Sequence, residues 1–102
     1  MNGHKAGGHL FLSRYRFVLK GAAAVMADKT RQYGEPQESL RRIGVKWGAQ
    51  LGLPQAIPPA TVARMMVDRA MVRAEMGAGS DTAEDAVNYA AMAAVLEGES
   101  NG

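Results

Sequence analysis

The stretch "SDTAEDAVNYAAMAAVL" (Ser80–Leu96) decides the fold, because its apolar residues recur at helical spacing and do not alternate. Tyr89, Met92 and Leu96 share one side of the predicted helix, as the packing face of an amphipathic helix would. The same side carries Asp85, one turn inside the helix. The stretch therefore predicts a core helix with a carboxylate on its packing face.

Helical periodicity outward from this stretch predicts three further helices. The four helices are expected over Leu10 to about Lys29, Pro36 to about Leu51, Pro59 to Met76, and Thr82–Glu97. Gly34 with Pro36, "GLPQAIPP" and "GAGSD" separate them, and no strand-type alternation is present. The sequence thus predicts an all-α helical bundle of about four helices, forming one domain over residues 10–97. A flexible N-terminal tail is expected over 1–9 and a C-terminal tail over 98–102.

The second and third predicted helices carry unusual packing faces. Gly44 and Gly48 lie four residues apart on one apolar stripe, which predicts that another backbone approaches closely there. The third helix has two apolar faces, one containing Met66 and the other containing Met65 and Met76. Such a helix is either central in a bundle or shared between subunits. Because four helices leave little to surround it, the sequence predicts a homo-oligomer.

Composition excludes several classes of protein. The 102 residues contain no cysteine, so a cytoplasmic setting is expected and thiolate metal sites are excluded. The net charge of +2 comes from dispersed basic residues, which disfavours nucleic-acid binding. No apolar run approaches the roughly 18 residues of a membrane span, so no membrane association is expected. His4 and His9 lie in a glycine-rich start, which disfavours a histidine metal site.

The acidic start of the last helix has more than one interpretation. Asp81, with Glu84 three residues later, has the spacing of a helix N-cap with a reciprocal partner. Asp85 lies deeper, where an unpaired carboxylate is costly to bury. It is expected either to pair with Arg69 or Arg73 on the third helix, or to contact a ligand.

The ligand interpretation of this face involves a metal ion. Asp81, Asp85, Asn88 and Tyr89 share the face, and Asp68 on the third helix could join them, as could Glu38 on the second. Carboxylates in this arrangement can hold Mg²⁺ with the phosphates of a substrate. Magnesium is the cofactor that this pattern predicts, with Asp68, Asp81 and Asp85 as its ligands and Asn88 and Tyr89 beside them.

A second candidate site lies at "DKTRQYG" (28–34), where the first helix ends. Lys29 and Arg31 suit phosphate recognition, and Tyr33 could stack on a base. A helix end with a tyrosine anchor and a left-handed Gly34 explains the same letters. Arg69 and Arg73 are further candidates for contact with an anionic ligand.

Several features of the sequence together match the pattern of one known family. They are the Tyr33–Gly34 pair with Pro36, the helix of Trp47, the paired methionines of the third helix, Arg73, and Asp81, Asp85 and Tyr89 on the fourth helix. On these residues, the span from Asp28 to Leu96 resembles a family of small proteins from tailed phages and prophages. That family is distantly similar to the MazG-like all-α nucleoside triphosphate pyrophosphohydrolases. The resemblance implies a helical oligomer that holds Mg²⁺ between acidic helices. It would match Asp85 to the closing aspartate of the last acidic pair in those enzymes. Asp68 would match the corresponding acidic position on their third helix.

The resemblance is incomplete, and the differences bear on activity. Thr82 stands where a glutamate is expected, and Ala70 where a lysine is usual. The sequence therefore predicts binding of a nucleotide or a nucleotide-derived signal in preference to hydrolysis, and whether the protein is an enzyme stays open. The alternative hypothesis is a phage-encoded inhibitor that binds a host enzyme or defence protein through its helical faces.

Overall fold

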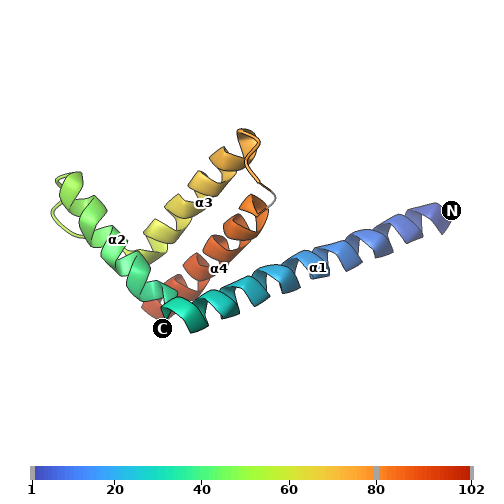
Figure 1. The fold of residues 1–102 in the computed structure, drawn as a ribbon, viewed down its shortest axis with the longest axis horizontal. Helices are drawn as coiled ribbons and strands as arrows, with labels where there is room; N and C mark the ends of the chain where they lie inside the picture. The colour runs from blue at the N-terminus through green and yellow to red at the C-terminus, as the bar shows by residue number, and fades with distance from the viewer. Residues whose placement is uncertain (1, 80, 102) are drawn as a thin grey trace.

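The protein is all-helical over the residues that its structure describes. A computed structural model describes the backbone of residues 2–79 and 81–101, and the side chains of residues 10–79 and 81–99. Within these ranges there are four helices and no strand, as predicted. The helices are α1 (Asn2–Tyr33), α2 (Pro36–Gln50), α3 (Pro59–Glu75) and α4 (Thr82–Asn101). Figure 1 shows α3 between α2 and α4, while the N-terminal part of α1 projects away.

The outer ends of the first and last helices differ from the prediction. The helical backbone of α1 begins at Asn2, so it includes most of the segment expected as a tail, and Met1 lies outside the described residues. At the other end α4 continues to Asn101. An established helix adds one hydrogen bond per residue, so it extends through glycines that would not nucleate one. No helix within the described ranges has the length and apolarity that a membrane crossing requires.

The core lies between α2, α3 and α4. Its buried residues are Leu40, Ile57, Val62, Ala63 and Ala93, and partly buried residues pack around them: Ile43, Trp47, Met65, Met66, Tyr89, Met92 and Leu96. The small side chains in this core allow α3 and α4 to approach closely. As predicted from the sequence, Tyr89, Met92 and Leu96 form the packing face of α4.

The glycines of α2 allow the loop after it to fold back onto the helix. A Cβ added at Gly44 would overlap the carbonyl oxygen of Ile57, and one added at Gly48 would lie 3.0 Å from the carbonyl oxygen of Gln55. The Ile57 N–H donates to the carbonyl of Gly44 at 3.1 Å. The predicted close approach of another backbone is confirmed, and that backbone is the connection between α2 and α3.

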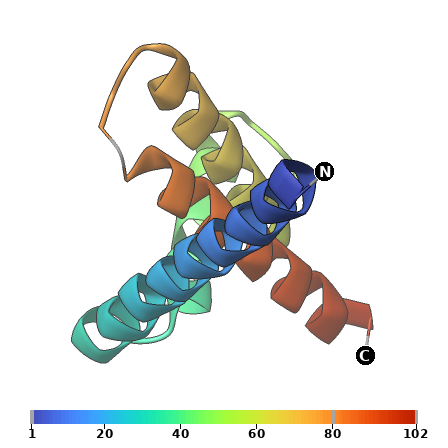
Figure 2. The same cartoon turned by 90° about the vertical axis from the view of Figure 1, so that its right-hand side faces the viewer.

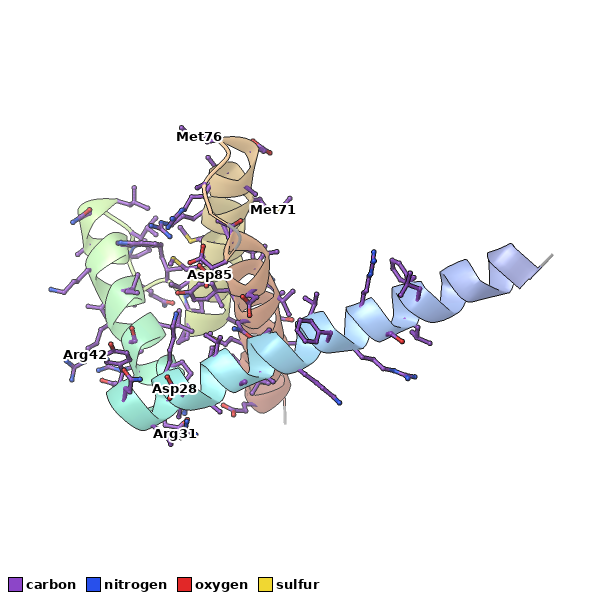
Figure 3. All side chains as sticks on the ribbon, turned by 45° about the vertical axis from the view of Figure 1, so that its right-hand side comes forward. Asp28, Arg31, Arg42, Met71, Met76 and Asp85 are labelled. Atoms are coloured by element: carbon purple, nitrogen blue, oxygen red, sulfur yellow. The ribbon has the colours of Figure 1, made fainter. Side chains whose placement is uncertain are left out.

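The two apolar faces of α3 are largely used within one chain. Because α3 packs against both α4 and α2, it has neighbours on both sides without a second subunit. Only its C-terminal end keeps large apolar side chains exposed, namely Met71, Val72 and Met76 (Figure 3). The reason from which self-association was predicted is therefore weaker than the sequence suggested, and the oligomeric state stays a prediction.

The first helix packs on the rest of the domain through its second half. Among the side chains of α1 that the structure describes, Ala22 is the buried one, at 1% exposed, and the helix contacts α4 in particular. Figure 2 shows α1 crossing α4. A Cβ at Gly21 would lie 3.4 Å from the Glu84 carboxylate at the start of α4. The projecting half of α1 gives the chain a radius of gyration of 16.7 Å, whereas a compact chain of this length would have about 13 Å.

Candidate functional site

The candidate site is built on the junction between α1 and α2. The first helix ends because Gly34 takes a φ of 85°, a conformation that glycine tolerates best, and its N–H donates to the Thr30 carbonyl at 2.9 Å. Pro36 begins α2 only two residues later. The residue before it, Glu35, makes no side-chain hydrogen bond to the helix start. No side chain therefore neutralises the partial positive charge at the start of α2, although Pro36 has no N–H and the Glu38 N–H donates to the Glu35 carbonyl at 3.3 Å.

A pocket of ≈ 440 Å³ lies where this junction faces the middle of α4. Its polar lining residues are Lys29, Thr30, Tyr33, Glu35, Ser39, Asp85, Asn88 and Tyr89. Its apolar lining residues include Met26, Leu40, Ile43 and Met92. The size, with an apolar floor and a few convergent polar groups, is typical of a small-molecule site.

The pocket unites half of the residues that the sequence singled out. Of the ten residues predicted to bind a ligand or metal, the structure places five along it: Lys29, Tyr33, Asp85, Asn88 and Tyr89. The other five do not line it: Arg31, Asp68, Arg69, Arg73 and Asp81. In Figure 3 Asp85 lies among the helices, whereas Arg31 lies at the outer side of the end of α1. The two sites that the sequence suggested separately, at the end of α1 and on the face of α4, thus lie along one pocket in the fold.

A family profile described as "Domain of unknown function (DUF6378)" matches residues 17–97. The chain belongs to the DUF6378 family. The matched span contains α2, α3 and every residue that lines the pocket, so the pocket of this chain lies entirely within the matched domain. No curated protein and no solved structure matches the chain.

The end of α1 in the DUF6378 domain combines both interpretations of "DKTRQYG". The left-handed Gly34 is confirmed as the structural device that ends the helix. The tyrosine anchor is wrong, because the side chain of Tyr33 is not buried and the residue is 80% exposed. Tyr33 therefore borders the pocket with a ring face that is free to stack on a ligand. Arg31 is occupied elsewhere, since it pairs with Asp28 at 3.0 Å.

Asp85 is half-buried and faces the pocket, not a cation of α3. Within the described residues it forms no ion pair with Arg69 or Arg73, so the predicted internal pair is wrong for the single chain. The physical reason is direction: Asp85 points toward the α1–α2 junction, whereas Arg69 is exposed on α3. The carboxylate is consequently available to accept hydrogen bonds from a ligand.

Asp81 takes the N-cap position without the predicted side-chain bond. Its carbonyl oxygen accepts the Asp85 N–H at 3.0 Å, which is the first hydrogen bond of α4. Among the described residues, no side-chain hydrogen bond joins Asp81 or Glu84 to the helix start. The hydroxyl of Thr82 instead donates to the Gly79 carbonyl at 3.1 Å. The predicted reciprocal cap is therefore not formed between these residues.

The predicted magnesium ligands do not converge in the DUF6378 domain. Among the described side chains, no three acidic, histidine or cysteine residues lie close enough to share a metal ion. Asp68 and Asp81 are exposed and lie off the pocket, while Asp85 lines it. The side chains of His4 and His9 lie outside the described residues. The donor set thus does not fit a metal held by the protein alone, and magnesium stays a prediction.

Glu38, the remaining candidate ligand, is held on the outer surface of α2. Its carboxylate accepts hydrogen bonds from Arg41 at 2.8 and 3.0 Å and from Arg42 at 3.0 Å. These bonds, first from Arg41 and then from Arg42, lower the pKa of Glu38 from 4.5 to about 2. Glu38 is therefore engaged in an ion-pair cluster away from the pocket.

This cluster has a testable acid dependence. Because the pKa of Glu38 is lower in the folded chain, its stabilising contribution is complete above about pH 4.5 and declines as the pH falls toward 2. Titration by NMR should show the Glu38 carboxylate ionised well below pH 4. Arg41→Ala should raise its pKa toward the ordinary value, whereas Arg31→Ala, which removes a comparable exposed arginine on α1, should leave it unchanged. An unshifted pKa in the native protein would contradict the arrangement.

Sequence reasoning missed several residues of the pocket. Glu35 and Ser39 contribute polar groups, and Ile43 and Met92 contribute to the apolar lining. Pro36 was recognised as a helix start, and the absence of a capping residue before it was a signal that an open helix terminus follows. Which other helix would face that terminus could not be read from local pattern.

Proposed function

We propose that this DUF6378 domain binds a nucleotide or a nucleotide-derived signal in the pocket between α1, α2 and α4. One observation carries the proposal: Lys29, Tyr33, Asp85, Asn88 and Tyr89 line a single cavity although they come from two distant segments. An ammonium, two phenol rings, a carboxylate and an amide are the groups that would recognise a phosphate, a base and a sugar.

The phosphates belong at the α1–α2 junction. Lys29 supplies a positive charge there, and the start of α2 at Pro36, which has no side-chain cap, supplies a partial positive charge. Anions bind helix N-termini for this reason. Ser39, in the first turns of α2, adds a hydroxyl to the same wall.

The nucleoside belongs toward α4. The exposed ring of Tyr33 can stack on a base, while the Asn88 amide can donate to and accept from a base edge. Asp85, one turn before Asn88, can accept hydrogen bonds from ribose hydroxyls. Met92 and Leu40 provide the apolar surface on which the base and sugar rest.

Binding, without turnover, is what these groups support. Magnesium in nucleotide sites is usually held by one or two carboxylates together with substrate phosphates. Asp85 and Glu35 are the carboxylates of this pocket, and Asp68 does not approach it. Hydrolysis of the MazG-like type remains a weaker extension of the proposal, because Asp68, the second acidic residue that the resemblance implies, does not line the pocket. The phage origin and the oligomeric assembly of the protein stay predictions.

The test is binding of nucleotides to the purified protein, followed by native mass spectrometry and calorimetry with and without Mg²⁺. Tyr33→Ala should weaken binding roughly 5- to 100-fold, because stacking contributes about 1–3 kcal/mol per base. Asp85→Asn should weaken it roughly tenfold or more, since hydrogen bonds to charged groups contribute about 1.5–3 kcal/mol. Because Tyr33 is exposed, its variant should retain the thermal stability of the native chain.

Asp68→Asn is the matched control for Asp85→Asn. It makes the same chemical change on an exposed helix surface outside the pocket, so nucleotide affinity should be unchanged. An equal loss of nucleotide affinity in both variants would contradict binding in this pocket. An absence of bound nucleotide from a pool that includes cyclic and triphosphate forms would overturn the proposal.

A second candidate function rests on the exposed end of α3. Met71, Val72 and Met76 are all exposed there, and methionine-rich surfaces adapt to protein partners. This surface supports the alternative of a protein inhibitor that binds a host enzyme or defence protein. Its signature would be a stable complex that Met71→Glu weakens and that Asp85→Asn and nucleotides leave unchanged.

A further inference from the structure

The projecting half of α1 carries apolar side chains without cover. We call residues 10–20 the arm. Phe11 is 69% and Phe17 79% exposed on it, and Tyr15 is also exposed. In Figures 1 and 3 this segment points away from the other helices. Aromatic side chains on a helix gain little stability in isolation, so the arm needs a surface to pack against.

The arm continues a stripe that is covered farther along the same helix. Phe11, Tyr15 and Val18 lie at helical spacing in line with Ala22 and Met26. The last two pack in the domain, Ala22 being buried and Met26 half-buried, while the first three are exposed. The rings of Phe11 and Tyr15 stack with centroids 6.4 Å apart, so they present one continuous face.

An apolar groove runs beside the second half of α1. It measures ≈ 550 Å³ and lies between α1 and α4. Its α4 wall includes the stripe Val87, Ala91 and Val95, of which Val95 is largely exposed, and its α1 wall includes the small residues Ala23 and Ala27. Asn88, Met92 and Leu96 complete the α4 wall. Because the alanine side chains of these walls are small, the groove has room for the bulky rings of an incoming helix.

The charges of the arm and of α4 are opposite in sign. The arm carries Arg14, Arg16 and Lys20, and the sequence has no acidic residue before Asp28. By contrast α4 contains four acidic residues and no basic one, and Glu84 and Glu99 fall on the face of the Val87–Val95 stripe. Within the described part of the chain, neither these three bases nor these two acids form an ion pair.

The exposed area is sufficient for a stable contact between copies. Aromatic residues bury about 150–250 Å² each, so the two rings on this face of the arm, Phe11 and Tyr15, offer roughly 250 Å² at their present exposures. A standard interface buries about 800 Å² per partner. A reciprocal arrangement in which each copy contributes both an arm and a groove buries this contact twice, for roughly 1,000 Å² over both copies, which is the lower end of specific interfaces.

From these observations we infer that a second copy of this chain is the occupant of the groove. The arm of each copy lies in the groove of the other, with the two α1 helices antiparallel and the basic arm against the acidic α4. A reciprocal contact of this kind closes as a two-fold dimer. Phe11, Tyr15 and Val18 of one copy then cover the stripe of α4 in the other.

The test is the solution mass by sedimentation and light scattering. The native protein should have twice the 10.8 kDa of one chain, and raised salt should weaken the dimer. Phe11→Glu with Tyr15→Glu should increase the dissociation constant at least 100-fold while circular dichroism keeps its helical signal, because both residues are exposed in one chain. Phe17→Glu is the matched control on the other side of the same helix and should leave the mass unchanged.

A second measurement fixes the position of the arm. Since the chain has no cysteine, mixing the single variants Tyr15→Cys and Ala91→Cys under oxidation can join them only between chains. A Tyr15–Ala91 cross-link should form faster than one between Phe17→Cys and Ala91→Cys. Tyr33→Ala, which tests nucleotide binding, should not change the mass. The dimer and the nucleotide site can therefore be disproved independently of each other.

Three outcomes would overturn the inference. A native protein that is monomeric at tens of micromolar would do so, as would dissociation by Phe17→Glu but not by the Phe11 and Tyr15 changes. A monomer that binds vesicles of anionic phospholipid through the arm would assign the basic, aromatic helix to a membrane surface instead.

Discussion

Replacing Gly44 with alanine is expected to lower the free energy of unfolding by about 2–4 kcal/mol. The added Cβ would overlap the carbonyl oxygen of Ile57 and would lie 3.3 Å from Cγ2 of Val62, a fully buried residue. The atom in the way belongs to the backbone, so no side-chain rotation can relieve the overlap. The loop must move, and the hydrogen bond from the Ile57 N–H to Gly44 weakens with it.

Thermal and denaturant unfolding would measure this change. A loss of this size corresponds to a fall of roughly 10–25 °C in Tm for a domain of about 100 residues. Gly98→Ala is the matched control, because it adds the same methyl group inside a helix where nothing lies within 4 Å. The control should be neutral or should gain up to about 1 kcal/mol from helix propensity. Equal stability of the two variants would refute the close approach.

Leu40→Ala is expected to cost a similar amount, about 2–4 kcal/mol, for a different reason. Leu40 is 3% exposed and belongs to the core cluster with Ile57, Val62 and Ala93. Truncation removes apolar contacts and leaves a cavity that the neighbouring helices fill only in part. Because Leu40 also lines both the candidate pocket and the adjoining groove, some relaxation is available, and the upper end of the usual range is not expected.

Leu51→Ala provides the comparison for this prediction. Leu51 lies on the same helical stripe in the sequence, but it is 67% exposed at the end of α2. Its truncation should change stability by no more than about 0.5 kcal/mol. Chemical denaturation of the two variants side by side would decide the point, and a loss at Leu51 as large as that at Leu40 would show that the end of α2 is covered in solution.

The contrast between Leu40 and Leu51 shows what helical periodicity in a sequence can and cannot predict. Spacing along one helix predicts which residues share a face, and it placed both leucines on the apolar stripe of α2. Burial depends on what lies opposite that face. Leu40 is buried because it belongs to the core cluster with Ile57, Val62 and Ala93, whereas Leu51 lies beyond the part of the stripe that the connection covers at Gly44 and Gly48.

The candidate site also depends on which helices lie opposite one another, which spacing along one helix does not predict. Local chemistry singled out Lys29 and Tyr33 at a helix end, and Asp85, Asn88 and Tyr89 on a helix face, as two separate possibilities. Their union in one pocket depends on how α1 crosses α4, and no local pattern encodes that crossing. For the same reason the sequence paired Asp85 with an arginine of α3, whereas the folded chain turns it toward α2.

The sequence by itself determined the four helices, their breaks at Gly34, Pro36 and Pro59, and the need for glycine at Gly44 and Gly48. These follow from backbone conformation and from spacing within one helix, which act between residues a few positions apart. The tertiary structure alone decided which faces meet: it joined two half-sites into a pocket and left the arm of α1 without cover. That outcome depends on contacts between residues far apart in the chain, where packing against a neighbour, and not local preference, sets the free energy.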